Sequence, residues 1–192
     1  MPPAQHLAWF TDNTDWFGAL ATDNLDTAVP ACPGWTVESV INHLTFGLGR
    51  GYPHALKAPA DCPDDKVFVD LEFPTTMPTG AEALSVFSLT MSNCSSEFAE
   101  TDPSTPCYTY EGPGVAGFWF RRAAIETTLH RMDVAEALNV DDRPLAVERL
   151  DDAIAESVEF ADTRNHKDLK VRDPPRTAHR DRLPVGQAVD WR

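Results

Sequence analysis

Three side chains from two distant segments could share one metal ion. Glu126 and His130 are four residues apart in FWFRRAAIETTLHRMDVAEALN, where apolar residues recur at helical spacing. At 3.6 residues per turn they project from the same helix face, so they could offer one oxygen and one nitrogen to the same cation. His43, in VINHLTF, lies at the edge of a second apolar stripe and is the candidate third ligand. A catalytic zinc site uses three protein ligands and keeps one position open, which this His2Glu set would satisfy.

Asp133 follows His130 by about one helical turn. We expect it to orient His130 by accepting the hydrogen of the ring nitrogen that does not bind the ion. Two plainer interpretations stay open. A glutamate and a histidine four residues apart often form only a surface ion pair, and His43 could be a structural histidine whose hydrogen bonds are satisfied in the core.

The cysteines suggest no further motif. Cys32, Cys62, Cys94 and Cys107 are widely spaced and include no CxxC pair. Without a secretion signal, such a pattern predicts isolated thiols, so we expect metal ligands to be histidine and carboxylate. The sequence also lacks the GxSxG, GxxxxGK[ST] and GxGxxG motifs of hydrolases, phosphate loops and dinucleotide sites.

Helical periodicity supplies the elements that would position these residues. Thr36 is a suitable N-cap for the helix that carries His43. Five prolines exclude a long helix between residues 52 and 78, where residues 67–73 could form a short extended piece. The pattern predicts an all-α four-helix bundle with long loops and an extra C-terminal helix. The expected helices cover about residues 3–22, 37–51, 80–99, 115–138 and, beginning after Pro144, a stretch to about 161.

Charge divides the 192-residue chain, whose formal net charge is −14. Residues 1–162 carry 8 basic and 26 acidic side chains, whereas residues 163–192 carry 8 basic and 4 acidic ones. We therefore expect a metal-binding helical bundle over 1–162 and an irregular, basic, proline-containing tail over 163–192. The acidic balance argues against a nucleic-acid partner. Because no long apolar run or signal-peptide pattern occurs, we expect no membrane span and a cytoplasmic location.

Two segments resemble a known family. VPACPGWTVESVINHL (29–44) resembles the V-P-x-C-P-G-W-[TS]-V signature of mycothiol-dependent maleylpyruvate isomerase N-terminal domains, which belong to the DinB/YfiT-like superfamily of metal-binding four-helix bundles. FWFRRAAIETTLHRMDVAEALN (118–139) is similar to the family's second signature, R-x-x-x-E-x-x-x-H-R-x-D. The resemblance extends over roughly residues 5–161. It implies that His43, Glu126 and His130 are the metal ligands and that the usual cation is zinc.

The resemblance also implies the chemistry. The family uses mycothiol, a low-molecular-weight thiol, as a cosubstrate, and a cation deprotonates a bound thiol near neutral pH to give a metal-bound thiolate nucleophile. In an isomerase the thiolate would add to a cis double bond, allow rotation and leave. In a transferase it would attack an electrophile and remain as a thioether. The expected partners are the thiol and an electrophilic or unsaturated small molecule, and a homodimer is left open.

The C-terminal part departs from the family's full-length isomerases, which carry a further domain that contributes a substrate-binding arginine. Here about 30 residues follow the last expected helix. This favours a mycothiol S-transferase, or another thiol-handling enzyme, over maleylpyruvate isomerisation itself. The alternatives are a non-catalytic metal-binding or regulatory interaction module with a docking tail, and a metal-free relative of the family.

Overall fold

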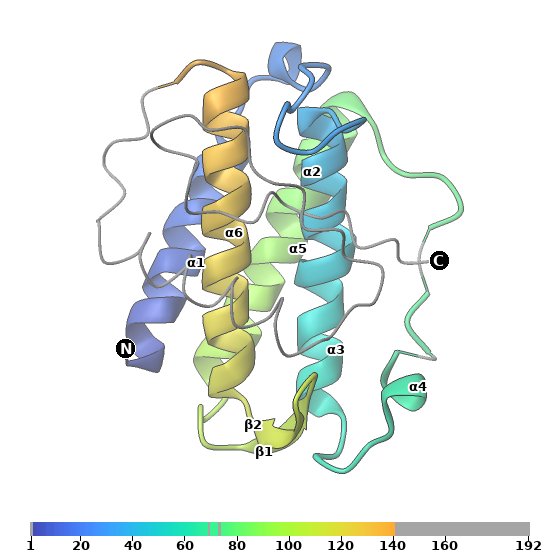
Figure 1. Cartoon of the computed structure of the whole chain (residues 1–192), viewed down its shortest axis with the longest axis vertical. Coiled ribbons are helices and arrows are strands. Elements are labelled where there is room, and N and C mark those ends of the chain that lie inside the picture. The colour runs from blue at the N-terminus through green and yellow to red at the C-terminus, as the bar shows by residue number, and fades with distance from the viewer. Residues whose placement is uncertain (1, 69, 73, 141–192) are drawn as a thin grey trace.

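Four long helical rods lie side by side in the computed structural model, which describes residues 2–68, 70–72 and 74–140 of the chain (Figure 1). The all-α bundle predicted from the sequence is thereby confirmed. The helix expected after Pro144 and the tail over 163–192 lie outside the described residues. None of the described helices combines the length and the apolar character needed to cross a lipid bilayer. The rods are α1 (Pro3–Gly18), the continuous series α2 (Val37–His43), η2 (Leu44–Arg50) and α3 (Gly51–Lys57), α5 (Gly80–Glu100) and α6 (Gly117–Ala137).

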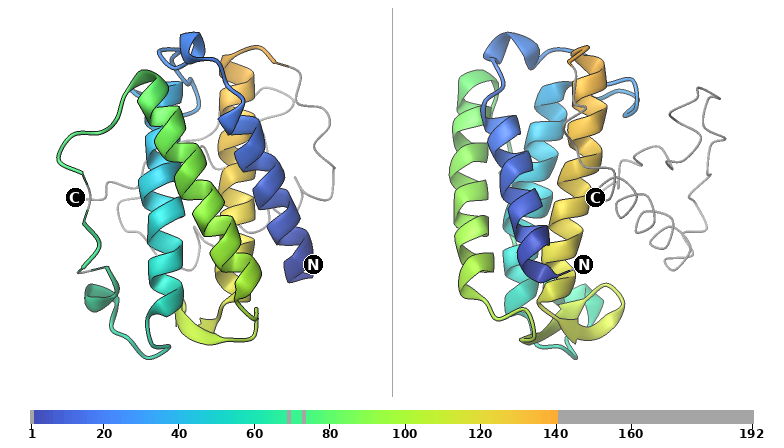
Figure 2. Two further views of the ribbon diagram at one scale, coloured as in Figure 1. Left: turned by 180° about the vertical axis from the view of Figure 1, so that it is seen from behind. Right: turned by 90° about the vertical axis from the view of Figure 1, so that its left-hand side faces the viewer.

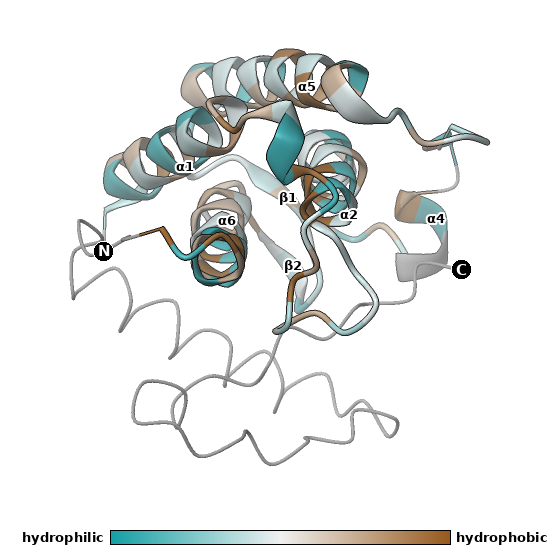
Figure 3. Ribbon diagram, turned by 90° about the horizontal axis from the view of Figure 1, so that it is seen from above, coloured by the Kyte–Doolittle hydropathy of each residue, from teal (hydrophilic) through white to brown (hydrophobic). Residues whose placement is uncertain are grey.

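The rods pack so that α6 and the α2–η2–α3 rod lie on the same side of the α1–α5 pair (Figures 2 and 3). Helix α1 contacts both α6 and α5, and α5 contacts the rod mainly through η2. Helix α5 buries one apolar face, as its periodicity predicts, whereas α6 is buried on several sides and includes buried polar residues. The largest fully buried side chains include Phe10, Phe17, Ile41, Leu44, Phe87, Met91, Phe98 and Trp119.

Helix α1 ends at Gly18, four residues before the predicted end. The backbone is extended at Ala21, and a short 3-10 helix, η1 (Thr22–Asn24), follows. Glycine has a low helix propensity, which agrees with an end of the helix at Gly18.

The helix that carries His43 begins as predicted and continues further than predicted. The Thr36 side chain accepts a hydrogen bond from the Ser39 N–H, and the Ser39 hydroxyl accepts one from the Thr36 N–H, which completes a capping box. The prediction that the helix stops at residue 51 is wrong, because η2 and α3 carry the rod to Lys57 despite Pro53. Segment η2 is a π-helix. Its wider turn relieves the clash that the proline ring would make with the preceding turn of a regular α-helix.

Two short elements differ from the sequence-based expectation. A single turn, α4 (Asp64–Val67), followed by a turn residue at Phe68, occupies the start of the segment expected to be extended. Strands β1 (Pro106–Thr109) and β2 (Gly112–Val115) form an antiparallel hairpin where a loop was expected. Glycine and proline are uncommon inside strands, so the composition of this segment does not predict a hairpin. The Trp119 indole N–H donates to the Tyr108 carbonyl at 2.7 Å and fastens the hairpin to α6.

Candidate metal centre

The structure brings together the three side chains that the sequence singled out. His43 is the last residue of α2, and Glu126 and His130 lie along α6. His43 Nε2 is 3.1 Å from Glu126 Oε1, and the two imidazole ring centres are 5.1 Å apart. One ligand atom from each of the three residues lies within 4.8 Å of the other two. Glu126 therefore pairs with His43 on another helix, and does not form only an exposed ion pair with His130.

The donor set suits a divalent cation. Ligands about 2.0–2.2 Å from one tetrahedral ion lie roughly 3.3–3.6 Å apart, so the His43–Glu126 separation needs little change to accept an ion. Only 11% of the His43 side chain and 20% of the Glu126 side chain are exposed. The Nδ1 atom of His130 lies on the Asp133 side of the ring, so Nε2 is the nitrogen that remains for this set.

Glu126 is the most heavily supported residue of the site. The Tyr52 hydroxyl donates a short hydrogen bond to Oε2, and the Arg122 guanidinium lies 3.8 Å from the same oxygen. Burial alone would raise the pKa of Glu126. The hydrogen bond and charge of His43, together with the charge of Arg122, outweigh it and lower the pKa to about 2. The carboxylate is therefore ionised throughout the neutral range.

The sequence did not indicate Tyr52 or Arg122 as part of the site. Tyr52 follows the residue where the helix was expected to end, and it enters the site because the rod continues. Burial, and then the charge of Glu126, raise the pKa of the Tyr52 hydroxyl well above its ordinary value, so it stays a proton donor. The Arg122 side chain is buried beside Glu126. The Arg131 side chain instead donates to Asp12 of α1 at 2.9 Å.

Asp133 lies beside the imidazole ring of His130. Its Oδ2 is 3.3 Å from His130 Nδ1, within ion-pair distance, although the direction does not give a hydrogen bond in this geometry. The Cys32 thiol donates to the same Oδ2 at 3.7 Å. Burial lowers the pKa of His130, but Asp133, the Cys32 side chain and the charge of Glu126 together outweigh burial and raise the pKa to about 10.

The PGW turn before α2 contributes directly to the site. Gly34 has φ of +86°, a conformation that favours glycine and allows the tight turn. The next residue, Trp35, places its ring centre 5.2 Å from that of His43 and 6.3 Å from that of His130, nearly parallel to the latter. The tryptophan of this turn therefore packs against both histidines.

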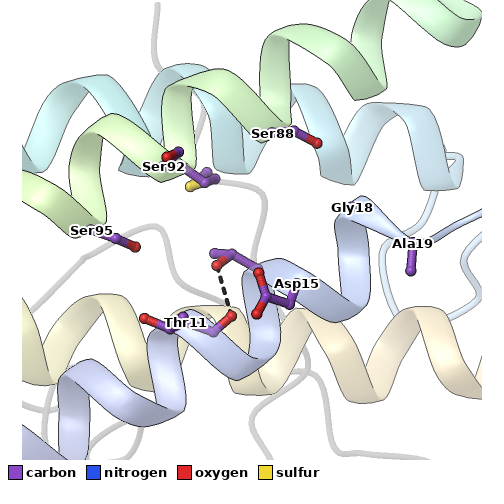
Figure 4. A pocket seen from close by; sticks show the side chains of 9 residues that line it. Thr11, Asp15, Gly18, Ala19, Ser88, Ser92 and Ser95 are labelled. Atoms are coloured by element: carbon purple, nitrogen blue, oxygen red, sulfur yellow. Dashed lines mark hydrogen bonds between the residues drawn. The ribbon is translucent and has the colours of Figure 1, made fainter.

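A separate pocket of about 450 Å³ lies between α1 and α5 (Figure 4). It shares no residue with the His43–Glu126–His130 set, and its lining contains neither histidine nor cysteine. We therefore assign it no part in the chemistry. The lining consists mainly of hydroxyl side chains with one carboxylate: Thr11, Thr14, Asp15, Ser88, Ser92 and Ser95, together with Gly18, Ala19 and Met91.

Comparison with known proteins identifies the family. A search of curated proteins and a search of solved structures each found no match. In contrast, residues 7–135 match the sequence model of the mycothiol maleylpyruvate isomerase N-terminal domain. The match spans most of the chain and includes the PGW turn, His43 and the Glu126–His130 segment. The chain therefore belongs to the mycothiol maleylpyruvate isomerase N-terminal domain family.

Proposed function

We propose that this chain is a zinc-dependent enzyme that uses mycothiol, either as a thiol S-transferase or in a reaction like that of maleylpyruvate isomerase. His43, Glu126 and His130 would hold the cation. The observation that carries the proposal is the approach of their three ligand atoms to within 4.8 Å of one another, from two helices of a chain in the mycothiol isomerase family.

The chain's own groups would prepare this site. Glu126 is ionised and uses Oε2 to bind Tyr52, which leaves Oε1, beside His43, for the cation. With His130 Nδ1 on the Asp133 side, Nε2 is the ring nitrogen that would serve this set. Asp133 would then act as the residue that orients His130.

The charge of the ligand set suits a thiol. Two neutral imidazoles and one carboxylate would leave a divalent cation with a net charge of +1, which favours the deprotonated form of a neighbouring thiol. That form is the nucleophile in both proposed reactions. The remaining exposure of His43 and Glu126 would allow a small molecule to reach the ion.

Metal analysis of the purified full chain tests the ligand assignment. We expect close to one equivalent of zinc, and its loss in His130→Ala with the helical circular dichroism retained. His54→Ala is the matched control, because His54 lies on α3 with its ring 6.3 Å from that of Phe68. No divalent metal in the wild-type protein, or full metal in His130→Ala, would show that the assignment is wrong.

A thiol-conjugation assay separates the enzyme from a non-catalytic metal-binding or regulatory module of the same family. The zinc-loaded chain would be incubated with mycothiol and an aryl halide electrophile, and in parallel with mycothiol and maleylpyruvate. A transferase forms the thioether, and an isomerase changes the double-bond geometry. Bound zinc with neither reaction would favour the binding module over the enzyme.

A further inference from the structure

We propose that the chain has a second metal site, for a soft cation, formed by Cys32, His130 and Asp133. One ligand atom from each of these residues lies within 4.8 Å of the other two. The set includes neither His43 nor Glu126, so it does not depend on the proposed enzymatic function, although both sets would use His130.

The geometry around Asp133 brings the three ligands together. Asp133 Oδ2 is 3.7 Å from Cys32 Sγ and 3.3 Å from His130 Nδ1. His130 is 9% exposed, and its Nδ1 has no hydrogen-bond partner. A buried nitrogen that faces a carboxylate and a thiol without forming a hydrogen bond points to a ligand, because buried polar groups normally form such bonds.

The ligands of the Cys32–His130–Asp133 set favour a different kind of cation from the ligands of the His43–Glu126–His130 set. Cys32 is a free thiol that is 4% exposed, and it would bind as the thiolate after losing its proton to solvent. Thiolate ligands favour soft cations, whereas the first set contains only nitrogen and oxygen donors. A soft ion is therefore expected to prefer the Cys32 set.

The two sets take different sides of the His130 ring. An ion bound to Cys32 and Asp133 would use Nδ1, the nitrogen on the Asp133 side. This ion would occupy the position from which Asp133 orients His130. A soft cation at the second site would consequently disturb the first site without contacting His43 or Glu126.

Cadmium titration of the zinc-depleted full chain tests the proposal, with thiolate-to-cadmium charge-transfer absorption as the readout. We expect the absorption in the wild-type protein and a loss of more than about tenfold in cadmium affinity in Cys32→Ser, since a ligand is removed. Cys94→Ser is the matched control, because Cys94 is also buried but lies on α5. It should bind cadmium as the wild type does.

His43→Ala distinguishes this site from the proposed zinc site. That variant should lose zinc but keep the charge-transfer absorption, because His43 belongs only to the first set. Absence of the absorption in the wild type, its persistence in Cys32→Ser, or its loss in a folded His43→Ala would each overturn the proposal. If Cys32→Ser does not fold, the ¹¹³Cd chemical shift of the wild-type complex decides directly whether sulfur is bound.

Discussion

Glu126 is the residue at which the supporting contacts of the candidate metal centre meet. One of its oxygens faces His43, and the other accepts from Tyr52 and lies near Arg122. These contacts hold the Glu126 carboxylate in one orientation even without a metal ion, because each of its oxygens already has a partner. A ligand that is held in place in this way loses less conformational freedom when it binds.

Removal of the Tyr52 hydroxyl tests this support. We expect Tyr52→Phe to weaken zinc binding by about 10- to 100-fold, the usual effect of losing a residue that holds a metal ligand. Tyr108→Phe is the control, since Tyr108 lies on β1 with its ring 6.4 Å from that of Trp119. Competition with a chelator measures both affinities. Equal zinc affinities in Tyr52→Phe and the wild type would show that the hydroxyl does not support Glu126.

The raised pKa of His130 predicts how metal affinity depends on pH. A cation binds only the neutral imidazole, and with a pKa of about 10 the metal-free residue is protonated near neutrality. Zinc affinity should therefore increase with pH up to about 10, with proton release on binding. The same shift stabilises the metal-free fold fully below pH 6.5, and this contribution is lost as the pH rises through about 10.

Asp133→Asn provides the matched variant for that pH profile. Without the carboxylate, the pKa of His130 should fall toward its ordinary value of 6.5, so zinc affinity should level off at a lower pH. Chelator-buffered titrations at several pH values measure both profiles. A parallel loss of affinity at every pH, with an unchanged profile, would mean that Asp133 serves only to hold the structure.

At the scale of elements, the π-helix η2 is the feature that the spacing of apolar residues did not predict. It begins directly after His43 and includes Gly49, which lies against α5. A Cβ at Gly49 would approach Thr90 Cγ2 to 2.9 Å and Met91 Cε to 3.0 Å. The close contact of the rod with α5 therefore requires glycine at this position.

Gly49→Ala should consequently lower the free energy of unfolding. Overpacking of this kind costs about 1–3 kcal/mol. Gly51→Ala is the control, because its Cβ would meet only the Phe46 carbonyl, at 4.0 Å. That change should be neutral or slightly stabilising, since alanine restricts the unfolded chain. Urea unfolding measures both, and equal stabilities of the two variants would contradict the predicted packing.

The comparison of sequence with structure shows which elements a pattern can predict. Helices α5 and α6 begin and end within two residues of the predicted bounds. A single apolar stripe runs along α5, whereas α6 is buried on several sides and includes buried polar residues. The continuation through Pro53 was missed because it depends on a π-turn, which has no apolar period of its own.

The candidate site likewise contains residues that the sequence could indicate and residues that it could not. Glu126 and His130 could be paired from helical spacing, and His43 could be proposed as the third ligand from its position at the edge of an apolar stripe. The family resemblance then implied the same three residues. The contact between Cys32 and Asp133 spans 101 positions in the sequence and joins a loop to a helix. Only the packing of the bundle brings such residues together, so no spacing rule could have indicated the Cys32 set.

On the scale of the whole molecule, the change in charge along the chain falls beyond the end of the family match. The family match ends at residue 135, and the described bundle extends to residue 140. The basic side chains are concentrated beyond it, since residues 163–192 carry 8 of the 16. We propose that the bundle over 1–162 contains all the residues needed for folding and metal binding, and that residues 163–192 are an appendage.

Deletion of residues 165–192 tests this division. The shortened chain should keep its helical circular dichroism, its melting temperature to within a few degrees and its zinc, because every proposed ligand lies before residue 134. Truncation after residue 130 is the contrasting variant. It removes Arg131, which binds Asp12 and Asn13 of α1, and Val134, which is fully buried, so it should unfold the chain. A collapse in thermal stability on losing 165–192 alone would mean that the basic segment packs against the bundle as part of the fold.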